Sequence, residues 1–272
     1  TPLYSSAASD VYKRQSPYNF IVGGGIFVKS YRLPLSLAWD AFGEKNGAPD
    51  PEMLRNLVNK RRTDRQIDPQ IGCTILNEPF FLPRERWIEA PADWKPNIVT
   101  GKLYGDDNPI GRELWERVKH AWVEETQRRN GFAVAENGAR YGREYLTRAR
   151  LGQGAFRILV TEAYGRACAV TGEHTLPVLE AAHIRPHAQD GPNRTDNGIL
   201  LRSDLHILFD RGYLTITPDH KIEISKRIKE EFDNGREYYP YHGMELKVLP
   251  ERRIERPSRE FIEWHNNNVF VA

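Results

Sequence analysis

The segment between Tyr164 and Ile216 constrains the fold more than any other part of this chain. It contains the apolar run LPVLEAAHI, the turn-rich loop HAQDGPNRTD, a second apolar run in NGILL, and then the pattern SDLHILFD. Short apolar runs separated by turn-forming residues indicate the strands of a hairpin, and the last pattern indicates a short helix. The segment therefore predicts a β-hairpin followed by a helix, with His183 at the end of the first strand, Asn197 after the loop, and His206 on the helix.

These three side chains can serve one kind of chemistry if the hairpin and the helix bring them together. Hydrolysis of a phosphodiester bond needs a base that activates water and a divalent cation that stabilises the developing charge. A neutral imidazole can act as that base, because its unperturbed pKa is about 6.5. Taken alone, however, a histidine at a strand end is more often structural, and Asn-Gly is a good turn in any protein.

The residues AHIRP, then NGILL, then His206 at the matching distance resemble the His-Asn-His (HNH) family of endonucleases. The resemblance implies a ββα-metal fold and a metal-dependent DNA endonuclease that hydrolyses phosphodiester bonds. It implies that His183 is the general base, that Asn197 holds the loop and orients the base, and that His206 binds the metal ion. We expect that ion to be Mg²⁺, Mn²⁺ or Ni²⁺.

One departure from the family pattern concerns the second metal ligand. Many HNH proteins carry Asp or His directly before the base, where this chain has Ala182. We expect Asp210 to supply the missing ligand, because it lies four residues after His206 on the same face of the predicted helix. The alternative is a carboxylate at the helix end that pairs with Arg202 or Arg211.

Two other carboxylates and one further histidine are less suited to the site. Glu180 is expected to point to the opposite strand face from the base, and Asp204 is expected to point away from His206. His265, near the C-terminus, has no spacing that links it to the motif, and we expect it to lie on the surface.

A second departure concerns zinc. Many family members hold a structural zinc with two C-x-x-C pairs, but here only Cys168 is present at the four corresponding positions. One cysteine cannot form a four-ligand site, so no structural zinc is expected. Apolar packing should hold this domain together instead, through Val170, Leu179, Ile199, Leu201, Leu205, Leu208 and Phe209.

The N-terminal half is expected to be a separate α+β domain. Residues 1–15 have no periodic apolar pattern and resemble a non-native sequencing artefact, the alternative being a native disordered tail. Residues 16–108 are rich in predicted strands and resemble an N-terminally truncated PUA-like domain of modification-dependent restriction enzymes. That resemblance implies a restriction or defence enzyme that reads modified DNA through a base pocket, for which the candidates are Trp39, Trp87, Trp94 and Tyr104. The alternative is that these aromatic side chains belong to a small core.

The remaining segments are assigned to a connection and to the nuclease. Residues 109–138 contain a predicted linker helix, and residues 139–272 are expected to form the nuclease domain. Arg148, Arg150 and Arg157 precede the motif, and arginine forks suit phosphate, so we expect them to contact DNA. A solvated helix face is the alternative.

Composition adds weaker constraints. The net charge is only +2, so any basic surface must arise from local clustering. No membrane span or signal peptide is visible, and the two cysteines are typical of reduced thiols in a cytoplasmic protein. The expected partner is double-stranded DNA, and a homodimer stays open. A non-catalytic DNA-binding protein with a degenerate HNH site and a nonspecific nuclease or toxin are the alternative functions.

Overall fold

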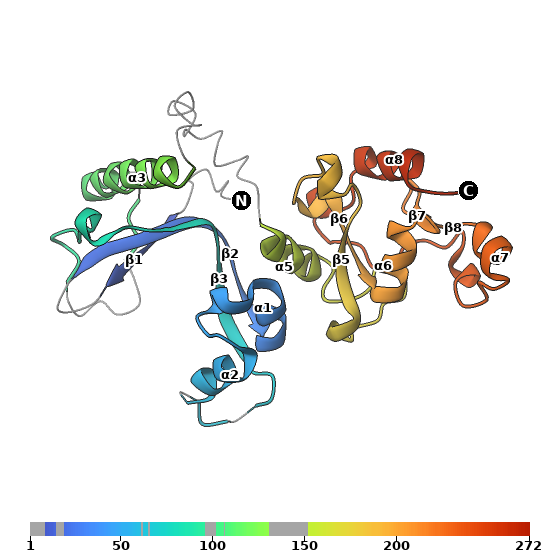
Figure 1. Ribbon diagram of the computed structural model, residues 1–272, viewed down its shortest axis with the longest axis horizontal. Helices are drawn as coiled ribbons and strands as arrows, with labels where there is room; N and C mark the ends of the chain where they lie inside the picture. The colour runs from blue at the N-terminus through green and yellow to red at the C-terminus, as the bar shows by residue number, and fades with distance from the viewer. Residues whose placement is uncertain are drawn as a thin grey trace. The chain divides into compact units, whose positions relative to one another are not determined.

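The computed structural model has a mixed α+β architecture with two compact units (Figure 1). It describes residues 9–14, 19–60, 62–64, 66–95, 102–105, 107–130 and 152–272. The first unit comprises residues 1–31 and 72–149, and the second comprises residues 32–71 and 150–272. Among the described residues, no helix is both long enough and apolar enough to cross a membrane.

The first unit is built on a four-stranded sheet in the order β1-β2-β3, with β4 paired to β2. Its elements are β1 (Ser9–Arg14), β2 (Phe20–Pro34), β3 (Gln70–Phe81), η2 (Arg84–Arg86), β4 (Ile88–Glu89) and α3 (Pro109–Asn130), and the ends of β2 and β3 continue into the second unit. Residues 9–14, within the segment that resembles an artefact, form a strand antiparallel to β2. Gly23 allows β2 to approach β3 closely, because an added Cβ would lie 2.4 Å from the carbonyl oxygen of Phe80.

Helix α3 packs on this sheet, although its sequence predicted a connecting helix. Its apolar residues occur at helical spacing and are buried with those of the strands, as the 6.2 Å separation of the Phe80 and Trp122 rings shows. The shared core contains Ile21, Ile26, Phe80, Leu82, Ile88, Leu114, Val118, Ala121 and Trp122.

Residues 32–71 group with the C-terminal half, whereas the sequence placed them in an N-terminal domain. They form α1 (Leu35–Phe42), η1 (Gly43–Asn46) and α2 (Pro51–Asn59), and α1 packs against α5 (Gln153–Ala163). Glycine at position 154 permits this contact, because an added Cβ would lie 2.2 Å from the carbonyl oxygen of Ala41. Arg166 Nη2 also donates a hydrogen bond of 2.8 Å to the carbonyl oxygen of Arg32.

The predicted hairpin and helix are present in the second unit. Strands β5 (Leu179–His183) and β6 (Gly198–Arg202) are antiparallel, and α6 (Ser203–Asp210) follows directly. The remaining elements are η4 (Leu176–Val178), η5 (His187–Gln189), η6 (Thr195–Asn197), β7 (Leu214–Ile216), β8 (Ile222–Ile224), α7 (Arg227–Phe232), η7 (Tyr239–Tyr241), η8 (Arg253–Glu255) and α8 (Arg259–Asn268).

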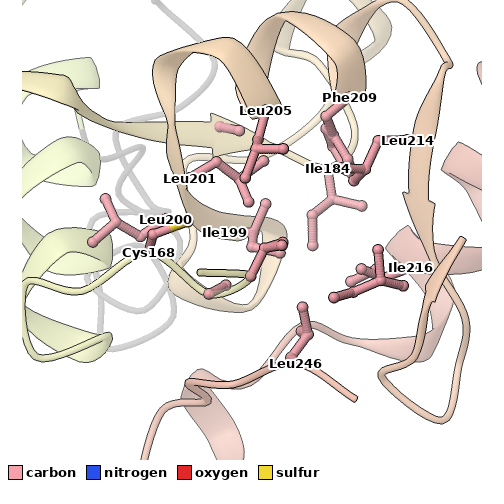
Figure 2. Packing of buried hydrophobic residues seen from close by; sticks show 14 of the residues in the cluster. Cys168, Ile184, Ile199, Leu200, Leu201, Leu205, Phe209, Leu214, Ile216 and Leu246 are labelled. Carbon is pink, nitrogen blue, oxygen red and sulfur yellow. The ribbon is translucent and has the colours of Figure 1, made fainter. Parts of the chain in front are cut away.

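The core of the second unit joins the hairpin, α6 and the C-terminal elements (Figure 2). All seven apolar residues predicted to hold this domain belong to it, with Leu208 only partly buried. Cys168 is a buried free thiol whose Sγ accepts backbone N–H groups from Thr171 at 3.5 Å and Arg202 at 3.3 Å. Its sulfur therefore ties the turn after α5 to the end of β6.

Candidate active site

The ends of β5 and α6 border a pocket of about 310 Å³. The structure brings three of the predicted site residues, His183, His206 and Asp210, to its wall. The other lining residues are Gln153, Ala181, Ile184, Pro186, His187, His265 and Val269. The pocket therefore combines a concentration of imidazoles with one carboxylate.

His183 is held at the last position of β5 by its ring as well as its backbone. It pairs with Gly198, where an added Cβ would lie 2.4 Å from Val160 Cγ2, so glycine lets α5 approach the hairpin. This approach places the Phe156 ring parallel to the imidazole, with 3.8 Å between centroids and 10° between planes. Stacking fixes the plane of the imidazole and removes water from one of its faces.

The protonation state of His183 follows from its environment. Burial lowers its pKa, and the hydrogen bond to Asn193 opposes part of that effect. The ring is therefore neutral near pH 7. Its Nε2 lies 2.8 Å from Asn193 Oδ1, and an oxygen acceptor there requires the proton on Nε2. Nδ1 is then the basic nitrogen. The sequence had not identified Asn193.

Asn197 fastens the loop that follows the base. Its side chain is fully buried, its Oδ1 accepts the N–H of Arg185 at 2.8 Å, and its Nδ2 donates to the carbonyl oxygens of Arg185 at 3.0 Å and Pro192 at 2.9 Å. Its own carbonyl oxygen accepts the N–H of Ile184 at 3.0 Å. The side chain thus acts on the loop backbone, whereas the amide that contacts His183 is that of Asn193.

His206 lies between two carboxylates. Its Nδ1 is 2.6 Å from Glu180 Oε2, and its Nε2 is 3.3 Å from Asp210 Oδ2. Glu180 was not expected in the site, because its strand position places it on the opposite face from His183. The structure brings it to His206 because α6 packs against β5. Asp204 pairs with Arg202 at 2.6 Å, so Arg202 is engaged away from Asp210.

The donor set at His206 fits a divalent cation. A histidine that binds a metal ion commonly donates its other N–H to a carboxylate, and Glu180 accepts from Nδ1 in this manner. The lone pair of Nε2 then faces Asp210, and imidazole with carboxylate suits first-row divalent cations. No three His, Cys, Asp or Glu side chains gather at metal-binding distances within the described ranges. Oxygen atoms from water and phosphate would therefore have to complete the coordination.

Removal of solvent raises the pKa of Asp210, and His206 partly opposes this effect. Glu180 adds to the increase through its own negative charge, and His183 opposes it. A cation bound between Asp210 and His206 would favour the ionised carboxylate.

His265 is buried, so the expectation of a surface histidine is wrong. Only 2% of the residue is exposed, and its ring stacks on Phe209 with 3.9 Å between centroids. Nε2 lies 3.1 Å from the carbonyl oxygen of Phe209 and must donate to it, and Nδ1 lies 2.8 Å from Oγ1 of Thr215, whose hydroxyl donates to Asn266 Oδ1. Burial lowers its pKa to about 4. Both nitrogens are engaged, which is typical of a structural histidine.

The arginines proposed to contact DNA divide into two groups. Arg148 and Arg150 lie outside the described residues. Arg157 is on α5, and its guanidinium pairs with Asp40 of α1 at 3.5 Å. That pairing assigns Arg157 to the contact between α1 and α5.

The four aromatic side chains proposed for a base pocket belong to different surroundings. Trp39 packs beside Leu35, Ala48 and Leu54 in the second unit. In the first unit, Trp87 packs against the core and donates from Nε1 to the carbonyl oxygen of Leu82 at 3.1 Å, and the Trp94 and Tyr104 rings are 6.3 Å apart. Tyr104 also donates to Asp93 at 2.7 Å. These contacts favour the alternative that the aromatic side chains belong to cores. Trp39 belongs to the second unit, and the other three belong to the first.

A comparison with protein families matches residues 168–217 to an HNH endonuclease model, HNH_2. The matched segment contains both strands of the hairpin, α6 and the pocket residues Ala181 to Asp210. No curated protein matches the chain. The C-terminal half therefore carries an HNH domain, the part of the resemblance that the motif predicted. The PUA-like identity of the N-terminal region stays a prediction.

Proposed function

We propose that this protein is a metal-dependent endonuclease that hydrolyses phosphodiester bonds in double-stranded DNA. The observation that carries the proposal is the shared pocket, where His183 lies near a histidine–carboxylate pair, His206 and Asp210. The HNH match over the same residues supports DNA as the substrate.

His183 acts as the general base in this proposal. Nδ1 removes a proton from the attacking water, while the Asn193 oxygen holds Nε2–H and stabilises the imidazolium that forms. Phe156 prevents rotation of the ring out of that plane. Because burial lowers the pKa of His183, the base stays unprotonated at and somewhat below neutral pH.

His206 and Asp210 would hold the cation, and Glu180 sets which nitrogen of His206 is available. A bound divalent cation would stabilise negative charge on the phosphate and on the leaving oxygen. Glu180 keeps the proton on Nδ1, so Nε2 presents a lone pair toward Asp210. Asn197 contributes by fixing the backbone between the base and the next part of the loop.

The biological role in this proposal is restriction or defence, with residues 16–108 reading modified DNA. Its support is the resemblance of residues 16–108 to PUA-like readers and the aromatic residues within that region. Digestion of matched unmodified, methylated and hydroxymethylated DNA tests this part. Equal cleavage of all three substrates would remove the reader role and leave the nuclease proposal intact.

A non-catalytic DNA-binding protein is the second candidate function. Ala182 is fully buried where many family members carry a ligand, and the described residues offer only a two-ligand pair facing the pocket. Supercoiled plasmid incubated with the full chain and Mg²⁺, Mn²⁺ or Ni²⁺ separates the two candidates. Conversion to the nicked form supports the endonuclease, and DNA binding without any nicking supports the second candidate.

A further inference from the structure

The loop between the base and Asn197 carries an arginine that the proposed mechanism does not use. Arg185 follows His183 by two residues, so its Cα lies within about 7 Å of the Cα of the base. It is partly buried, and it forms no ion pair with any carboxylate that the structure describes. A charged side chain that lies beside a pocket, with no counter-ion within the described ranges, needs an explanation.

The backbone of Arg185 is held rigidly. The buried Asn197 amide binds both its N–H and its carbonyl oxygen, at 2.8 Å and 3.0 Å. Gly191 packs against the same carbonyl group, where an added Cβ would lie 1.8 Å from the oxygen. The loop after the base therefore packs closely around the backbone of Arg185, and the side chain of Asn197 fixes the position of that backbone.

The side chain of Arg185 is also held in place. Its Nε donates to the carbonyl oxygen of Gln189 at 2.7 Å, and its guanidinium carbon lies 5.5 Å from the centroid of the Trp264 ring on α8. Both contacts restrict the guanidinium but leave the terminal Nη groups without a hydrogen-bond acceptor in the described part of the chain. A pre-organised fork with free N–H groups suits a planar or tetrahedral oxyanion.

Three other arginines in the second unit differ from Arg185 because each pairs with a carboxylate. Arg194 pairs with Asp196, Arg202 pairs with Asp204, and Arg259 of α8 pairs with Glu263. Their charges are largely neutralised by carboxylates of the same chain. Arg185 is the one of these four whose charge is left for an external anion.

We propose that Arg185 is a phosphate clamp for the DNA strand that enters the pocket. It binds a backbone phosphate beside the bond that is cut and positions that strand against His183. The inference rests on the proposed function, because DNA supplies the phosphate. Contacts of this kind fix the register of the duplex and carry no base specificity.

Salt-dependent DNA binding by the full chain tests the clamp without cleavage. A fluorescein-labelled duplex is titrated in EDTA at several KCl concentrations, and binding is followed by fluorescence anisotropy. Arg185→Gln should weaken binding about tenfold at low salt, and should reduce the slope of log K against log[KCl] by about 0.9, the value for one phosphate. Arg185→Lys should recover most of the slope but only part of the affinity.

Arg259→Gln is the matched control, since it removes the same charge from an arginine that already pairs with Glu263. It should leave the slope nearly unchanged. Thermal melting of each variant checks the fold. Equal slopes for Arg185→Gln and Arg259→Gln would overturn the clamp, as would a wild-type chain without salt-dependent binding. Plasmid nicking by the same wild-type preparation judges the proposed function separately, so the two ideas can fail independently.

Discussion

Two histidines on the wall of one pocket stack on phenylalanine rings in nearly the same way, but they differ in which ring nitrogens have hydrogen-bond partners. His183 stacks on Phe156 at 3.8 Å and His265 stacks on Phe209 at 3.9 Å, both with nearly parallel rings. Burial lowers the pKa of both. His265 has protein partners on both nitrogens, whereas His183 has a hydrogen-bond partner only on Nε2 among the residues that the structure describes. The comparison teaches that burial and stacking alone do not distinguish the proposed base from a structural histidine, and that the available lone pair on His183 does.

Replacement of His183 should have the largest effect. His183→Ala removes the base and should lower the single-turnover rate of DNA cleavage by about 10²–10⁴-fold, with DNA binding in EDTA largely unchanged. His174→Ala is a matched control, since that histidine is exposed in the same unit and outside the pocket. Wild-type turnover by His183→Ala would remove the base from the account.

Lowering the pH should destabilise the folded chain through protonation of His265. The pKa of His265 is about 4 in the folded chain and about 6.5 when unfolded, so between these values the unfolded state binds more protons. The contribution of neutral His265 to the free energy of unfolding should therefore be at its maximum above about pH 6.5. The free energy of unfolding should fall by about 3 kcal/mol as the pH drops to 4.

The measurement is urea unfolding at stepwise pH, compared with His265→Gln, which cannot gain a proton. The variant should be less stable at pH 7 but should lose less stability between pH 6.5 and 4. Parallel pH dependence of the two proteins would show that His265 is not buried as a neutral ring.

Glu180 should have the smallest effect, because it acts through His206. Glu180→Gln should weaken Mn²⁺ binding about 10- to 100-fold, as measured by calorimetry without DNA. Asp204→Asn removes a carboxylate from the same helix as His206, but one that pairs with Arg202, and should leave Mn²⁺ affinity close to wild type. Similar losses in both variants would point to a general charge effect instead of a bond to His206.

Local spacing predicted much of the C-terminal site. The order of strand, loop, strand and helix placed His183, Asn197 and His206 correctly on their elements, because each depends on short-range periodicity. Asp210 follows His206 by one helical turn, and the structure places it 3.3 Å from Nε2. These relations are internal to single elements or to one hairpin.

The rest depends on packing between distant elements. The contact of Glu180 with His206 needs the approach of α6 to β5, and the contact of Asn193 with His183 needs the conformation of the intervening loop. For His265 a signal existed, since Phe261, Ile262 and His265 lie on one face of α8. The grouping of residues 32–71 with α5 involves contacts across more than a hundred residues of sequence, and Gly154 is a local sign of that close approach.

Chelation tests the central claim, a metal-dependent nuclease whose fold does not rely on zinc, most directly. Nicking of plasmid by the full chain is followed with Mn²⁺, after addition of EDTA, and after Mn²⁺ is restored in excess, with circular dichroism recorded at each stage. The account predicts that EDTA stops nicking, that restored Mn²⁺ recovers it, and that the dichroism signal stays constant. Nicking that persists in EDTA, or a large loss of dichroism on chelation, would contradict it.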